Sequence, residues 1–106
     1  MQSPKFEYII GIQKKENNIK PVSYNCPYEN IEKVKDDINV IIYGKDLKGN
    51  DCNEYKTINL EENEDGFYWV KILVRYFPNN DGTYDQIFEL QNIEKGEKNI
   101  NPFSKI

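Results

Sequence analysis

The chain has 106 residues, of which 38% are hydrophobic and 13% aromatic, and it carries a net charge of −4 at neutral pH. A chain of this length suits a single domain that buries roughly two thirds of its unfolded surface without metal or disulfide staples. The acidic balance argues against general binding to duplex nucleic acid, because such binding needs a basic surface to neutralise phosphates.

The cellular location is predicted from segments that the sequence lacks. No stretch approaches the roughly 18 apolar residues of a membrane span, and residues 1–7 carry charges where a signal peptide needs an apolar core. We therefore expect a cytoplasmic protein in which Cys26 and Cys52 are free thiols. A disulfide between them would instead close a loop of about 25 residues and stabilise the fold by roughly 3 kcal/mol. Abundant Lys, Asn, Ile and Tyr with no alanine is typical of an AT-rich genome.

The start of the chain predicts a hairpin. Residues 5–13 alternate between apolar and polar side chains, which predicts a half-buried strand with a bulge at Gly11. Residues 14–18 form an Asn-rich turn, and residues 19–26 form the return strand. Pro21 has no backbone N–H group to donate, which places it on an edge strand or at a strand start.

The middle of the chain predicts one helix and two strands. Pro27 favours the start of a helix over about residues 28–37, where Ile31, Val34 and Ile38 form a narrow apolar stripe. Residues 38–45 predict a third strand because β-branched residues are dense there, and residues 54–60 predict a fourth. Residues 46–53 form a polar turn between them, and residues 61–66 form an acidic turn.

The strand predicted over residues 67–77 is the longest apolar run in the sequence. Its even positions are all apolar, whereas its odd positions mix aromatic and charged residues. If residues 80–82 form a three-residue loop with Gly82 left-handed, residues pair across this hairpin so that their numbers sum to a constant. The predicted pairs are Val74 with Phe88, Ile72 with Leu90, Arg75 with Ile87, Leu73 with Glu89, and Lys71 with Gln91. Glu89 would then lie within ion-pair reach of Lys71 and Arg75.

These elements predict an α+β fold that is mostly β, in the order ββαββββ. It would be an antiparallel sheet or small open barrel of about six strands with one short helix. We expect one β-rich domain over residues 1–95, followed by a flexible or partner-docking tail over residues 96–106.

The side-chain inventory predicts a protein that is not an enzyme. The sequence has no histidine to act as a general base near neutral pH or to activate a Ser or Cys nucleophile. It has no Gly-rich phosphate loop, and two cysteines without histidine do not supply a zinc site. Carboxylate pairs could act as acid and base, but they cluster in turns, where exposure keeps their pKa values ordinary. We therefore expect no catalytic residue, cofactor or metal.

The acidic turn is the first candidate site, and its carboxylates belong to Glu61, Glu62, Glu64 and Asp65. It lacks the spaced Asp/Asn-x-Asp pattern of a calcium loop, so a solvated turn is the better interpretation of the two. It could also be an acidic prong directed at the Lys and Arg residues of a partner. The sequence does not separate the solvated turn from the prong, although salt-sensitive association would favour the prong.

The second candidate site is the odd face of the strand over residues 67–77. Its functional residues would be Phe67, Trp69, Lys71, Arg75 and Phe77. Aromatic and cationic side chains on one sheet face are typical of single-strand nucleic-acid platforms and also of protein-binding hot spots. Alternatively, the helix or a second layer covers Trp69, while the two cations extend outward and pair with Glu89. The acidic net charge favours a protein partner over nucleic acid.

The resulting hypothesis is a small acidic protein that inhibits a basic, nucleic-acid-binding partner by stoichiometric docking. A phage-type anti-defence protein, similar in role to an anti-CRISPR, or an immunity protein would fit this description. The alternative is a single-stranded nucleic-acid-binding β-barrel that uses the face of strand 67–77. A carbohydrate or small-ligand module is a third possibility because the chain has eight tyrosines, although tyrosine is also common in sheets.

Overall fold

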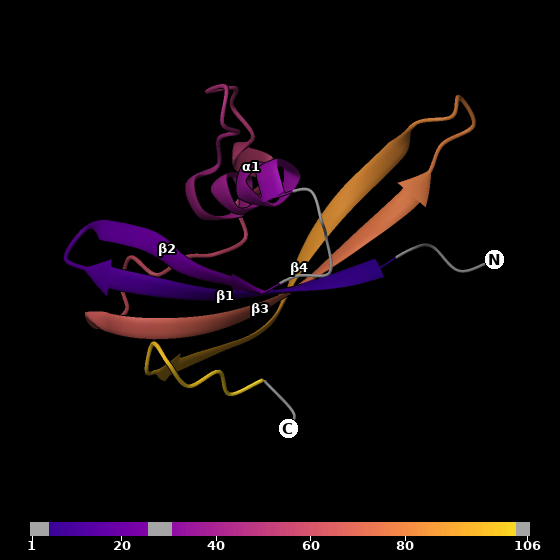
Figure 1. The fold of residues 1–106 in the computed structure, drawn as a ribbon. Coiled ribbons are helices and arrows are strands. Elements are labelled where there is room, and N and C mark those ends of the chain that lie inside the picture. Colours follow the sequence, from indigo (N-terminus) through magenta and orange to yellow (C-terminus); the bar gives the residue numbers. More distant parts are fainter. Residues whose placement is uncertain (1–4, 26–30, 104–106) are drawn as a thin grey trace.

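The computed structural model describes residues 5–25 and 31–103. It contains a four-stranded antiparallel sheet with one helix across one face (Figure 1). The strands are β1 (Lys5–Lys15), β2 (Asn18–Asn25), β3 (Gly66–Pro78) and β4 (Tyr84–Gly96), and the helices are α1 (Ile31–Tyr43) and the single-turn 3-10 helix η1 (Asn53–Tyr55). The spatial order is β2-β1-β3-β4, so β2 and β4 form the edges of an open sheet. The predicted α+β, mostly antiparallel β class is confirmed.

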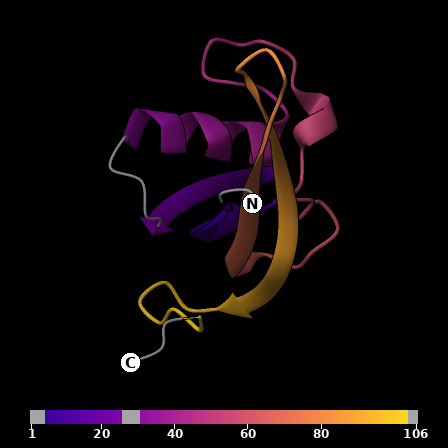
Figure 2. The same cartoon turned by 90° about the vertical axis from the view of Figure 1, so that its right-hand side faces the viewer.

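The hydrophobic core lies between α1 and the sheet face beneath it (Figure 2). Side chains of a strand alternate between its two faces, so every second residue of β1 and β3 points toward the helix. The core residues are Tyr8, Ile10 and Ile12 of β1, Tyr68, Val70, Ile72 and Val74 of β3, Val34, Ile38, Ile41 and Ile42 of α1, and Ile58 and Leu60. Burial of each such aliphatic side chain contributes about 1.5–3 kcal/mol, so this cluster supplies most of the driving force for folding.

The strand predicted over residues 38–45 is wrong, because α1 continues to Tyr43. Val34, Ile38 and Ile41 recur at helical spacing and are all buried against the sheet, so packing of the apolar stripe overrides β propensity. Gly44 ends the helix with a positive φ of 73°, and its N–H donates to the carbonyl of Val40 at 2.9 Å. The predicted helix start at Pro27 lies outside the described residues.

The strand predicted over residues 54–60 is also wrong. Its first residues belong to η1, and the chain then runs in extended form past the end of α1. The N–H groups of Thr57 and Ile58 both donate to the carbonyl of Ile41, which has no partner within its own helix end. The side chains of Ile58 and Leu60 pack in the hydrophobic core, but this segment forms no strand of the sheet. The order of elements is therefore ββαββ with η1 inserted, and not ββαββββ.

The first hairpin is close to its prediction. β1 and β2 pair antiparallel, and their register shifts between Gly11 and Ile12, because Val22 of β2 has no counterpart in β1. The bulge expected at Gly11 is thus present, with its extra residue on the partner strand. A Cβ at Gly11 would lie 2.7 Å from the ring of Phe67, so only glycine allows this ring to approach. Pro21 lies on the edge strand, as predicted.

The second hairpin confirms four of the five predicted pairs. Val74 pairs with Phe88, Ile72 with Leu90, Arg75 with Ile87, and Leu73 with Glu89, and Gly82 is left-handed with φ 88°. The fifth pair is wrong: Lys71 lies opposite Asn92, because Gln91 forms a bulge in β4. Before the bulge the even-numbered residue Phe88 faces the core, and after the bulge the odd-numbered residue Ile93 does. The extra residue Gln91 causes this change of face.

The β3–β4 hairpin extends beyond the rest of the sheet. β1 accompanies β3 only from Gly66 to Arg75, so the last residues of β3 have β4 as their strand neighbour in the described part of the chain. Figure 1 shows this two-stranded arm projecting past the end of β1, on the same side of the molecule as α1. The arm thereby brings the start of β4 close to the helix.

Candidate functional site

The acidic turn is held by internal ion pairs. Lys56 contacts Glu61 at 2.7 Å, and Lys95 contacts Glu64 at 2.8 Å. These hydrogen bonds lower the pKa of each glutamate, and the one that Lys95 donates to Glu64 also raises the pKa of Lys95. The turn therefore presents carboxylates whose charge is partly compensated within the chain.

The opposite end of the acidic turn is anchored by a buried lysine. The Nζ atom of Lys14 donates to the carbonyl of Asn63 at 2.5 Å and lies 3.8 Å from Asp65. Asp65 also accepts a hydrogen bond from the backbone N–H of Glu16 at 2.9 Å. Glu62 is exposed to solvent. Of the four predicted carboxylates, three thus take part in interactions that fix the turn in place.

The odd positions of β3 lie together on the sheet face opposite α1, which we term the far face. Phe67 is 7% exposed and Trp69 is 4% exposed, and their rings meet edge to face with centroids 5.4 Å apart. The indole N–H of Trp69 donates to the carbonyl of Glu97 at 2.8 Å. The chain after β4 turns back beneath this face (Figure 1). In this conformation neither ring is available for base stacking.

The cations of the far face are also paired. Lys71 contacts Glu7 at 2.9 Å, and Arg75 contacts Glu89 at 3.6 Å. The ammonium group of Lys71 also lies 5.9 Å from the ring centre of Phe103. Glu89 therefore pairs with Arg75, as predicted, but Lys71 pairs with a residue of β1. Phe77 is half-buried at the outer end of β3.

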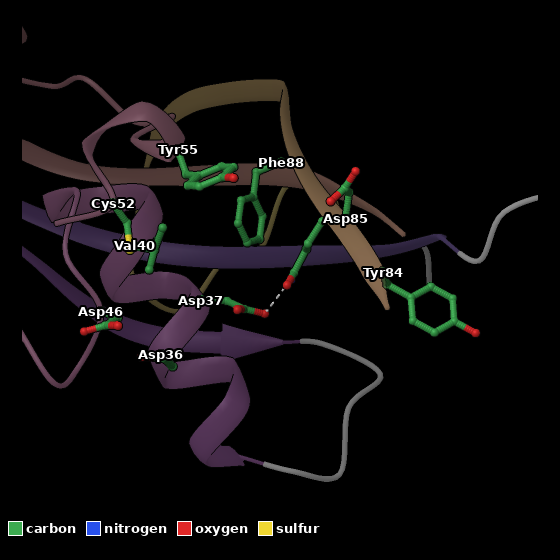
Figure 3. Close-up of a pocket in the computed structure, with 10 residues that line it drawn as sticks. Asp36, Asp37, Val40, Asp46, Cys52, Tyr55, Tyr84, Asp85 and Phe88 are labelled. Atoms are coloured by element: carbon green, nitrogen blue, oxygen red, sulfur yellow. Dashed lines mark hydrogen bonds between the residues drawn. The ribbon is translucent and has the colours of Figure 1, made fainter. Parts of the chain in front are cut away.

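A pocket of about 310 Å³, which the sequence did not predict, lies between α1 and the start of β4. We term it the α1–β4 pocket. Its lining combines carboxylates and tyrosines with an apolar floor: Asp36, Asp37, Val40, Asp46, Cys52, Tyr55, Tyr84, Asp85, Gln86 and Phe88 (Figure 3). Among the described residues, no Lys or Arg side chain lines this pocket. Such a pocket suits a cationic group, because carboxylates attract its charge and aromatic rings contact its apolar stem.

A buried hydrogen-bond network forms the inner wall of this pocket. Asp37 of α1 is 3% exposed, and its Oδ2 atom accepts a hydrogen bond from the Tyr8 hydroxyl at 2.7 Å. The same atom accepts one from Gln86 Nε2 at 3.1 Å, the dashed line in Figure 3. Gln86 also lies 3.3 Å from the hydroxyl of Tyr76. The network connects α1 with β1, β3 and β4, so it fixes the arm against the helix.

The carboxylates at the mouth are oriented by the loop that follows α1. Asp36 accepts a hydrogen bond from the backbone N–H of Leu47 at 2.8 Å. Asp46 accepts hydrogen bonds from the side chain of Asn50 and from two backbone N–H groups, and these bonds lower its pKa. Asp46 is therefore ionised at neutral pH. The mouth thus holds fixed negative charges, and the free thiol of Cys52 lines it without a disulfide partner.

Sequence reasoning missed this pocket because its residues come from four separated segments. The sequence does show two adjacent carboxylates, Asp36 and Asp37, and an Asp-containing turn after the helix. These residues indicate a pocket only when it is known that α1 extends to Tyr43 and that β4 lies beside α1.

Comparison of the chain with protein families, with curated proteins and with solved structures gives no match. None of the helices in the described ranges has the length and apolar character of a membrane span. In the same ranges, no group of three or more His, Cys, Asp or Glu side chains is arranged to hold a metal ion.

Proposed function

We propose that the protein is a non-enzymatic acidic binding protein that docks on a basic, nucleic-acid-binding partner protein and inhibits it stoichiometrically. The observation that carries this proposal is the α1–β4 pocket, where Asp36, Asp46 and Asp85 surround a cavity of about 310 Å³. A cavity of this size admits a Lys or Arg side chain with its stem. The net charge of −4 supports the same partner class, since it attracts basic surfaces over long range.

The inhibitor hypothesis further explains why the carboxylates are held so firmly. Hydrogen bonds hold Asp46 and lower its pKa, so this residue presents its charge without reorganisation, which improves affinity for a cationic partner. A phage-encoded antagonist of a bacterial defence nuclease, or an immunity protein, would use such a surface to occupy the site of a nucleic-acid backbone.

The test compares two sets of neutral variants in capture experiments. The first changes Asp36, Asp46 and Asp85 to Asn, which keeps one acceptor oxygen at each position, and the second changes Glu61, Glu62 and Glu64 of the acidic turn to Gln. Immobilised wild-type protein is incubated with host lysate, with and without nuclease treatment, at low and high salt. We expect one basic protein to be captured, in a fixed molar ratio, and released at high salt.

The purified partner is then titrated against each variant. We expect the pocket variant to bind at least tenfold more weakly, whereas the acidic-turn variant retains binding, because Lys56 and Lys95 compensate two of its three carboxylates, Glu61 and Glu64. Thermal unfolding checks that both variants fold. Unchanged affinity in both variants, or capture that depends on nucleic acid, would overturn the proposal.

A further inference from the structure

The two edges of the sheet differ in how well they are protected from pairing with another strand. β2 carries Pro21 and the bulge at Val22, and both features interrupt the row of backbone donors along that edge. β4 has no proline, its bulge lies only at Gln91, and its first lysine is Lys95. Residues 84–90 of β4 therefore form a regular edge, and β3 is their only strand neighbour in the described part of the chain.

The edge formed by residues 84–90 exposes several large apolar side chains to solvent. Tyr84 is 61% exposed, and Ile87 and Leu90 are each 43% exposed. Tyr84 and Leu90 lie on the side of β4 that faces the helix and Ile87 lies on the far face, so exposed apolar side chains flank this edge on both sides, where an added strand would contact them. The edge position of β4 and its exposed apolar side chains thus coincide over residues 84–90.

The α1–β4 pocket opens beside this edge. Gln86 and Phe88 line it from the side of β4 that faces the helix, and Phe88 also packs against the core. A strand laid along β4 would place every second side chain on the helix side of the sheet, which is the side of the pocket. Strand addition commonly takes affinity from main-chain hydrogen bonds and specificity from side-chain pockets next to the edge.

We propose that residues 84–90 of β4 bind an extended segment of the basic partner by antiparallel or parallel strand addition, with an Arg or Lys side chain of that segment in the α1–β4 pocket. The inference rests on the proposed function and specifies how the partner is held. Charge selects this occupant, because Asp36, Asp46 and Asp85 lie around the pocket beside an edge that has no cation before Lys95.

A second copy of this chain is the weaker occupant. In the antiparallel arrangement centred on Ile87, Asp85 of each copy would lie opposite Glu89 of the other. Like charges directly opposite each other in a sheet are destabilising. A foreign basic strand avoids this repulsion.

The first experiment uses three labelled nine-residue peptides as probes for the full chain in fluorescence anisotropy titrations. One alternates Arg and Val, one alternates Arg and Pro with the same charge, and one alternates Glu and Val. We expect the Arg–Val peptide to bind at least tenfold more tightly than either of the others, because it alone is both cationic and able to form a strand. Equal binding of the Arg–Val and Arg–Pro peptides would overturn strand addition.

The second experiment locates the contact. Amide hydrogen exchange of the chain with the Arg–Val peptide is expected to slow in residues 84–90 and to remain unchanged in residues 18–25 of β2. Ile87→Pro and Leu90→Pro then remove single N–H groups that point to opposite sides of β4, so one of the two leaves the β3–β4 pairing intact. That variant should bind the peptide at least tenfold more weakly, whereas threonine at the same position should change affinity less than threefold.

The outcomes separate the inference from the proposed function. If the captured partner binds in a salt-sensitive manner that the pocket variant abolishes, but β4 amides stay unprotected and the folded proline variant binds normally, strand addition is wrong and acidic docking stands. Should both proline variants unfold, the exchange pattern alone decides. A dimer of the free chain that protects residues 84–90 would replace the foreign strand with a second copy.

Discussion

Asp37 is the most deeply buried acidic side chain of the pocket, with 3% of its surface exposed. A carboxylate removed from water is tolerated when hydrogen bonds compensate the lost hydration, and Tyr8 and Gln86 each donate one. Because these donors come from β1 and β4, the carboxylate also determines where the arm lies relative to α1. One residue thus links stability with the shape of the proposed binding surface.

We expect Asp37→Ala to destabilise the fold by about 1–3 kcal/mol, since it removes the Oδ2 atom that accepts hydrogen bonds from Tyr8 and Gln86 within the network. Asp36→Ala is the control at the adjacent position of α1, and it removes the less buried carboxylate that accepts from the N–H of Leu47. Chemical denaturation of both variants measures the difference in the free energy of unfolding. Equal effects of the two substitutions would show that the network adds nothing to stability.

At the level of elements, the segment after β4 covers Trp69 on the far face of the sheet. Glu97 accepts from the indole of Trp69, and Glu97 and Ile100 form an isolated β-bridge. A Cβ at Gly96 would lie 3.2 Å from the Trp69 ring, so the chain passes close to the indole as it leaves the sheet. The residues predicted as a tail over 96–106 therefore begin with contacts to the central strand.

The single tryptophan allows this contact to be measured by fluorescence. We expect a short-wavelength emission maximum in the full chain and a shift to longer wavelength when residues 97–106 are deleted, because the indole then meets water. A truncation after Phe103 is the control and should leave the emission unchanged. Quenching of the full chain by a single-stranded oligonucleotide would instead revive the nucleic-acid alternative.

The elements differ in how far the sequence could predict them. Alternation in β1 and β3 and the left-handed Gly82 determined strand positions and most of the second register, because these signals are local. The strand predicted over residues 38–45 is wrong because Val40, Ile41 and Ile42 favour strands by propensity. Only their burial against the sheet explains why they form part of a helix. The α1–β4 pocket required knowledge of which segments meet in space.

For the whole molecule, acid pH should weaken the fold through several carboxylates at once. Hydrogen bonds lower the pKa values of Asp46, Glu61, Glu64 and Asp81 in the folded chain. A group with a lowered pKa contributes stability above its unfolded value, and this contribution is lost as the pH falls through its folded value. We expect the melting temperature to be nearly constant above about pH 5 and to fall steadily below it.

Thermal unfolding measured from acid to neutral pH tests this expectation. Glu64→Gln should reduce the slope of melting temperature against pH on the acid side, because its proton no longer takes part. Glu62→Gln is the control in the same turn. An identical acid slope in wild type and Glu64→Gln would show that the pair with Lys95 does not contribute to the pH dependence.

The place of β1 in the sheet also affects how the protein is made. β1 lies between β2 and β3 in the sheet, yet β3 begins only at Gly66, long after β1 ends at Lys15. During translation, the first hairpin and α1 emerge while one side of β1 still lacks its neighbour. The growing polypeptide therefore exposes the apolar residues of β1 until β3 leaves the ribosome, and chaperone contact is expected in that interval.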